Sequence, residues 1–136
     1  MTSGLHHLSL GVTDLSRSVR FYDAALASLG LVRVWSDLRP GAPGQAVGYG
    51  IAGGGDLLAL KEHADGAPVT TGAGFHLALA APSREAVHRF HAAALAHGGR
   101  DVGAPGPRPA YGPHYYAGFV LDPDGHRLEA VIDTAE

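Results

Sequence analysis

The sequence predicts an α+β domain in which a unit of one strand, one helix and three strands occurs twice. Three observations predict it: a constant offset that aligns the two halves, an apolar helical stripe in each half, and short apolar runs after each stripe. Such patterns separate helices from strands. Strands that form antiparallel sheets, with helices packed on one face, give the α+β class.

The internal repeat is the strongest of these observations. A shift of 69 positions (76 minus 7) places Leu5–Leu10 on Gly74–Leu79, so that His7 falls on His76. The same shift aligns positions along the helix that follows: Asp14 with Ser83, Phe21 with Phe90, Leu26 with Leu95, and Gly30 with Gly99. One offset across a strand, a helix and both helix ends indicates a true repeat. We therefore expect one domain over residues 1–136, with repeats over about 1–69 and 70–136.

Each half is expected to begin with a strand followed by a helix. Strand periodicity places His7 and Ser9 on one face, opposite to Leu8 and Leu10. The helical stripes come next, at Leu15, Val19, Tyr22, Leu26 and Leu29, and at Val87, Phe90 and Ala94. Asp14 and Ser83 are the expected N-caps, and Gly30 and Gly98–Gly99 end the helices.

Three short apolar runs after each helix are expected to be strands. They span 31–35, 46–51 and 57–60 in the first half, and 100–102, 115–121 and 127–132 in the second. The segment 103–113 contains Pro105, Pro107, Pro109 and Pro113, which predicts an extended loop. His126 is expected to be exposed in a turn.

Composition narrows the function classes. The chain has 136 residues, no cysteine and a formal net charge of -3. Without cysteine, a metal site must use His, Asp or Glu, which suits Zn, Mn, Fe, Ni or Co. The absence of a basic surplus argues against nucleic acid and a membrane surface as partners. No signal peptide or membrane span is readable, so we expect a cytoplasmic protein.

A metal site is predicted from three residues. If a pseudo-twofold axis relates the repeats, the equivalent residues His7 and His76 converge on it. Glu129 lies in an apolar strand, and glutamate is rarely buried unless it is paired or bound. Two histidines and one carboxylate leave open positions on a divalent metal, which is typical of a catalytic site.

These segments resemble the vicinal oxygen chelate superfamily, which includes glyoxalase I, methylmalonyl-CoA epimerase, extradiol dioxygenases, and fosfomycin- and bleomycin-resistance proteins. The resemblance rests on His7–Leu15 with Phe21–Tyr22, on Gly74–His76, and on Phe119–Glu129 with its Asp-Pro-Asp-Gly turn. It implies curved antiparallel sheets around a central metal cleft, with His7, His76 and Glu129 as ligands. Homodimers are common among such relatives.

The superfamily often has a fourth ligand at the position that corresponds to Glu129 in the first repeat. The offset of 69 places Leu60 there, whereas aligning Gly54–Gly55 with Asp124–Gly125 places Ala59 there. Neither can bind a metal, and Glu62 could do so only after a register slip. This departure argues against glyoxalase I activity itself.

Residues Tyr111–Tyr116 resemble a segment that many relatives carry near the site, except that the histidine is displaced by two positions. His114, Tyr111 and Tyr116 are thus candidate acid/base or orienting groups, together with Glu129. The resemblance implies a metal-dependent lyase or isomerase of glyoxalase type, acting on a small substrate with neighbouring oxygens. A non-haem Fe(II) dioxygenase and a metal-free drug-binding resistance protein are the alternatives.

Overall fold

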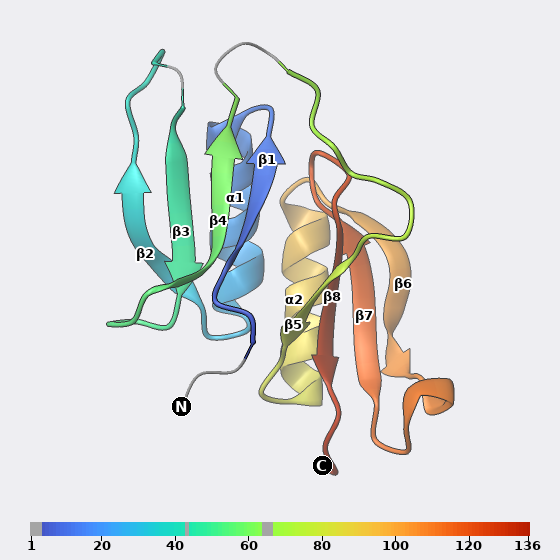
Figure 1. Ribbon diagram of the computed structural model, residues 1–136. Coiled ribbons are helices and arrows are strands. Elements are labelled where there is room, and N and C mark those ends of the chain that lie inside the picture. The colour runs from blue at the N-terminus through green and yellow to red at the C-terminus, as the bar shows by residue number, and fades with distance from the viewer. Residues whose placement is uncertain (1–3, 43, 64–66) are drawn as a thin grey trace.

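Two copies of the βαβββ unit follow one another along the chain (Figure 1). The structure is a computed structural model that describes residues 4–42, 44–63 and 67–136. The first unit comprises β1 (Leu8–Val12), α1 (Leu15–Ala27), β2 (Val32–Asp37), β3 (Ala46–Gly50) and β4 (Asp56–Glu62). The second comprises β5 (Leu77–Ala80), α2 (Arg84–Ala96), β6 (Arg100–Pro107), the 3-10 turn η1 (Pro109–Tyr111), β7 (Tyr116–Leu121) and β8 (Arg127–Ile132). The predicted α+β fold is confirmed.

Each unit forms its own four-stranded sheet, ordered β1-β4-β3-β2 in the first and β5-β8-β7-β6 in the second. The sheets are mixed, because β1 pairs with β4 and β5 with β8 in parallel, while the other pairs are antiparallel. The helix carries the chain back to the end of the sheet where the unit began. The following three-strand meander therefore ends on a strand that runs parallel to the first.

Both helices begin where the sequence places their caps. The Asp14 carboxylate accepts a hydrogen bond from the Arg17 backbone N–H, and the Ser83 hydroxyl oxygen accepts one from the Ala86 N–H. These bonds satisfy backbone donors that have no partner in the first helical turn. Among the described residues, no helix is long and apolar enough to cross a membrane.

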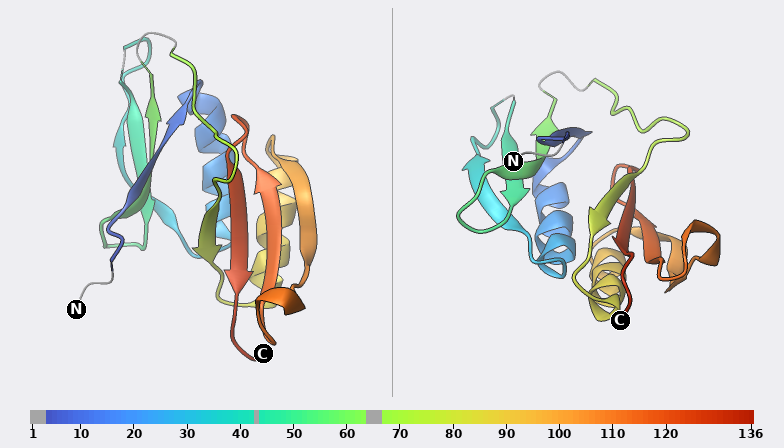
Figure 2. Two further views of the ribbon diagram at one scale, coloured as in Figure 1. Left: turned by 45° about the vertical axis from the view of Figure 1, so that its right-hand side comes forward. Right: turned by 60° about the horizontal axis from the view of Figure 1, so that its bottom comes forward.

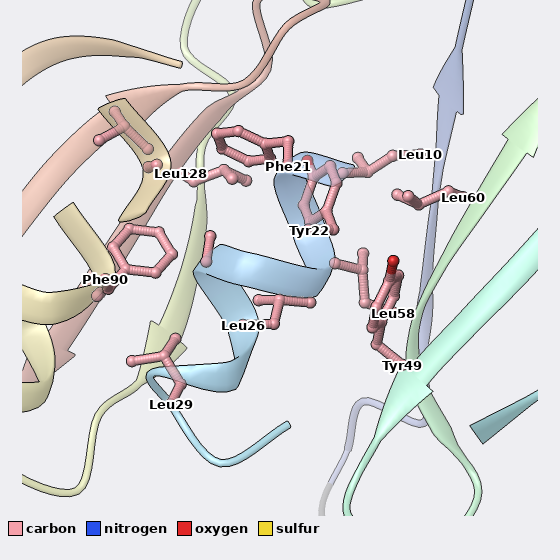
Figure 3. Packing of buried hydrophobic residues seen from close by; sticks show 14 of the residues in the cluster. Leu10, Phe21, Tyr22, Leu26, Leu29, Tyr49, Leu58, Leu60, Phe90 and Leu128 are labelled. Atoms are coloured by element: carbon pink, nitrogen blue, oxygen red, sulfur yellow. The ribbon is translucent and has the colours of Figure 1, made fainter. Parts of the chain in front are cut away.

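The helices pack against each other, and each also covers its own sheet (Figure 2). Around α1, Phe21 and Leu29 point toward Phe90 and Leu128 of the second unit, while Leu58 and other side chains of the first sheet lie on the opposite side (Figure 3). Phe21 is fully buried. One continuous core thus joins the two units, and truncation of such a phenylalanine to alanine costs about 3–5 kcal/mol.

The proline-rich segment is more regular than predicted. Strand β6 extends through Pro107, and η1 follows it, so only part of 103–113 is irregular. Strand β6 lies at the edge of its sheet, where proline is tolerated because one side of the strand needs no N–H donors. The register shifts between Gly103 and Gly106 accommodate the prolines.

Hydrogen bonds hold the turn between β7 and β8 of the second unit against the first unit. The buried Asp122 accepts a 2.6 Å hydrogen bond from the Tyr22 hydroxyl. The carboxylate of Asp124 accepts one from the Thr13 hydroxyl at 2.6 Å. His126 Nε2 lies 2.7 Å from the Gly11 carbonyl oxygen, and this histidine is buried. The expectation that His126 is exposed was wrong, because the turn packs against the other repeat.

Candidate metal site and pocket

The candidate site lies on the face of the second sheet that points away from the helices. Along β8, Leu128 and Ala130 belong to the core cluster. By strand alternation, Arg127 and Glu129 therefore point to the opposite face. Glu129 is 2% exposed even so, because neighbouring side chains surround it there.

Two polar side chains hold the Glu129 carboxylate. His76 Nε2 lies 3.1 Å from Oε1, and the Tyr115 hydroxyl donates a 2.5 Å hydrogen bond to Oε2. Burial raises the pKa of Tyr115 to about 12, and the hydrogen bond to Glu129 adds to this effect. Tyr115 therefore remains protonated at neutral pH and serves as a donor to the carboxylate.

The spacing of His76 and Glu129 fits two ligands of one metal ion. Metal–nitrogen and metal–oxygen bonds are about 2.0–2.2 Å long, so two ligand atoms at right angles are about 3 Å apart. The 3.1 Å between His76 Nε2 and Glu129 Oε1 matches that distance. The imidazole is 45% exposed, so the pair is accessible from outside.

The third predicted ligand, His7, lies elsewhere. It precedes β1 in the other sheet, is exposed, and its Nδ1 lies 2.8 Å from Nδ1 of His6. Within the described part of the chain, no group of three or more His, Asp or Glu side chains gathers in a metal-binding arrangement. One copy of the chain thus brings His76 and Glu129 together, but not His7.

The sheet registers settle which residue of the first repeat corresponds to Glu129. In the second sheet Ala78, two positions after His76, pairs with Glu129. In the first sheet Ser9, two positions after His7, pairs with Ala59. Glu62 instead accepts a 2.8 Å hydrogen bond from the Leu15 N–H at the start of α1. The corresponding position is therefore Ala59, and Glu62 is used in the fold.

A pocket of about 530 Å³ surrounds the pair. Its lining combines apolar, aromatic and charged side chains with one glycine: His76, Val102, Gly103, Arg108, Tyr111, Tyr115, Phe119, Arg127 and Glu129. Of the four predicted acid/base residues, Glu129 and Tyr111 line this pocket, and Tyr111 is 69% exposed.

The other two candidates lie outside this lining. The Tyr116 hydroxyl is 2.5 Å from His88 Nε2, and the Arg84 guanidinium lies over its ring, so Tyr116 faces α2. His114 is exposed in the turn before β7. The pocket instead contains Tyr115, which the sequence reasoning missed. The signal was the strand alternation: Tyr115 and Phe119 are four apart, and Phe119 pairs with Glu129.

Comparison with known proteins agrees with this fold. The family model of the Glyoxalase/Bleomycin resistance protein/Dioxygenase superfamily matches residues 4–130. This chain belongs to that superfamily. The superfamily includes the glyoxalase and dioxygenase classes named above, and glyoxalase I enzymes are among the structural neighbours.

Solved structures of the superfamily superpose well on this member. A glyoxalase/bleomycin resistance protein from Albidiferax ferrireducens is 31% identical, with a TM-score of 0.71, and 93% of this chain aligns with 96% of that one. A glyoxalase-related enzyme from Fulvimarina pelagi is 26% identical, with a TM-score of 0.67 over 93% and 86% of the chains.

Maize glyoxalase I shares the fold at 23% identity, with a TM-score of 0.71, and 90% of this chain aligns with 43% of the maize chain. No protein of curated function matches the sequence.

Proposed function

We propose that this protein is a divalent-metal-dependent lyase or isomerase of glyoxalase type that acts on a small substrate with neighbouring oxygen atoms. The observation that carries the proposal is the contact between His76 and the buried Glu129 at the base of the pocket. A buried carboxylate beside an imidazole, in a cavity large enough for a small metabolite, is the arrangement expected of a metalloenzyme site.

The metal ligands in this proposal are His76 and Glu129 of one copy and His7 of a second copy in a homodimer. Two features support this division. His7 is exposed just before β1, and several large apolar side chains are exposed as well, including Trp35, Leu57 and Phe75. Exposed apolar groups of this kind suit a protein interface.

When bound, the metal acts as a Lewis acid that stabilises negative charge on the substrate oxygens. The protein supplies the proton chemistry. Glu129 is the one carboxylate in the described pocket lining, so it is the group that accepts a proton from substrate carbon and returns it. Tyr115 holds this carboxylate in place through Oε2, and Tyr111 lies beside Tyr115 with ring centroids 5.3 Å apart.

The alanine at position 59 bears on the reaction. It leaves one coordination position that a fourth protein ligand fills in many relatives, and that position is then open to substrate or water. We therefore propose a glyoxalase-type reaction other than that of glyoxalase I itself.

The test is elemental analysis of protein purified without a histidine tag, beside the His76→Ala variant. About one equivalent of a divalent metal per chain, lost in the variant, is the expected result. Iron, with oxygen-dependent turnover of catechols, would indicate a dioxygenase instead. Absence of metal after loading with Zn, Mn, Fe, Ni and Co, with no difference in the variant, would contradict the proposal and favour a metal-free binding protein.

A further inference from the structure

The pocket contains two guanidinium groups that no carboxylate neutralises in the described structure. Arg108 donates to the Gly106 and Ala104 carbonyl oxygens at 3.0 and 2.8 Å. The Arg127 backbone pairs with Leu121 in the sheet, but its side chain makes no hydrogen bond or ion pair with any described residue. By contrast, Arg17, Arg33 and Arg89 each contact a carboxylate.

We infer that the substrate of this pocket is a small organic anion with an apolar or aromatic body, and that Arg127 binds its anionic group. The inference rests on the proposed function, because it concerns the same pocket. Its evidence is nevertheless separate: it depends on the charge and walls of the pocket, and not on a metal.

The position of Arg127 favours this role. It stands two residues before Glu129 on the same strand, so both side chains project from one face of the sheet. It also lines an adjoining groove of about 440 Å³, formed mainly by Thr71–Phe75 and the turn at Gly125. Arg127 therefore stands at the border of the two cavities, where a substrate bound beside Glu129 would extend.

The charge balance of the pocket gives the sign of the ligand. Its described lining contains two arginines and one carboxylate, and that carboxylate already contacts His76 and Tyr115. The pocket is therefore cationic before any metal binds. An unpaired guanidinium recognises a carboxylate through two parallel N–H donors, which gives both affinity and orientation.

The remaining walls indicate the body of the ligand. Two side chains of the pocket pack against the Phe119 ring: the Arg108 guanidinium is 5.6 Å from its centroid, and the His76 ring meets it edge-on with centroids 6.2 Å apart. Tyr111 and Val102 add further apolar surface. Such walls favour a flat or apolar body, while Arg108, fixed by its carbonyl contacts and by Phe119, forms part of the wall.

The test compares phenylacetate with the uncharged 2-phenylethanol by titration calorimetry on the full chain. Both ligands are measured with chelator-treated protein and with metal-loaded protein. The variants are Arg127→Gln and, as a matched control, Arg20→Gln, which removes a positive charge that is likewise exposed, but on α1. Circular dichroism confirms that each variant is folded.

We expect phenylacetate to bind the metal-free protein more tightly than 2-phenylethanol does. Arg127→Gln should weaken phenylacetate binding about tenfold or more, with little change for the alcohol. Arg20→Gln should leave both unchanged. Equal binding of the two ligands, equal loss in both variants, or no phenylacetate binding with or without metal would overturn the inference. Because the first comparison uses metal-free protein, failure of the metalloenzyme proposal alone would leave this result intact.

Discussion

The two repeats share their element order but differ on the sheet face that points away from the helices. In the second repeat Glu129 pairs with Phe119 on the neighbouring strand, and the edge strand beside Phe119 has Gly103. In the first repeat Ala59 pairs with Gly48, and the edge strand beside Gly48 has Trp35. An aromatic side chain and a glycine have thus exchanged strands between the repeats.

This exchange has a steric basis. A Cβ atom added at Gly48 would come within 2.2 Å of Trp35 Nε1, so the indole lies directly over that glycine. A Cβ added at Gly103 would come within 3.0 Å of Phe119 Cδ1. In the first repeat the tryptophan lies over Gly48, the strand partner of Ala59, whereas in the second the phenylalanine is the strand partner of Glu129. The helix-facing residues preserve the fold, and the outward faces carry the difference in chemistry.

The strongest test of this comparison introduces the missing carboxylate into the first repeat. Ala59→Glu would place a charge at a position that is only 2% exposed, and the free energy of unfolding should fall by about 3–5 kcal/mol. Ala52→Glu is the matched control, since it makes the same substitution at an exposed position of the first repeat. Its effect should stay below about 1 kcal/mol. Equal urea midpoints for the two variants would show that the two positions do not differ.

A second prediction compares the hairpin turns that precede β4 and β8. Asp122→Ala removes the acceptor of the Tyr22 hydroxyl and of the Asp124 and His126 N–H groups. Leaving buried donors unpaired should cost about 2–3 kcal/mol of unfolding free energy. Asp56→Ala, at the end of the corresponding turn of the first repeat, should cost less than about 1 kcal/mol. Thermal melts check both, and a larger loss in the Asp56 variant would contradict the anchoring role of Asp122.

The neighbouring tyrosines of the second repeat sharpen the assignment of the site. Tyr115→Phe should weaken metal binding about tenfold, because the hydroxyl that orients Glu129 is lost. Tyr116→Phe should leave metal affinity unchanged, because Tyr116 contacts His88 on the other face. Metal titrations against a chromophoric chelator measure both. A larger loss of metal affinity in Tyr116→Phe than in Tyr115→Phe would show that Tyr116, and not Tyr115, belongs to the site.

The smallest expected effect is a pH dependence that arises at Asp122. Burial raises the pKa of this carboxyl above its ordinary value of about 4, so the folded protein holds the proton more tightly than the unfolded chain does. The contribution of this proton to stability is complete below about pH 4 and is lost as pH rises through the raised pKa. Asp122→Asn cannot titrate, so its stability relative to wild type should rise between pH 4 and 7. Parallel stability profiles in urea would contradict this.

Local signals in the sequence were sufficient for the fold. Both units were predicted from the caps at Asp14 and Ser83 and from the helical stripes, which depend on residues that are close in sequence. The shared offset of His7 and His76 then aligned the two units. The offset of 69 gave the wrong counterpart of Glu129. His7 and His76 are 69 positions apart, but Ala59 and Glu129 are 70 apart, because loop lengths differ between the repeats. Only the strand registers resolve that ambiguity.

Features that depend on contacts between the repeats were not predictable in this way. The burial of His126 depends on the Gly11 carbonyl of the other repeat. Equivalence of His7 and His76 in sequence predicted that they share a site, but left open whether it closes within one chain or across a dimer. Within one chain the units are joined through α1 and α2, and the two histidines do not come together. The choice of Tyr115 over Tyr116, by contrast, was within reach of the sequence, because strand alternation places Tyr115 on the same face as Phe119, the partner of Glu129.

The most direct test of the central claim, a metal site shared between two copies, combines two inactive variants. His7→Ala and His76→Ala are co-expressed with different non-histidine tags, and heterodimers are isolated by using both tags in sequence. Each variant alone should lack metal. The heterodimer should regain one site, which pairs the intact His7 of one copy with the intact His76 and Glu129 of the other. Recovery of about one metal ion per heterodimer is the predicted result, and heterodimers as empty as the parent variants would contradict the shared site.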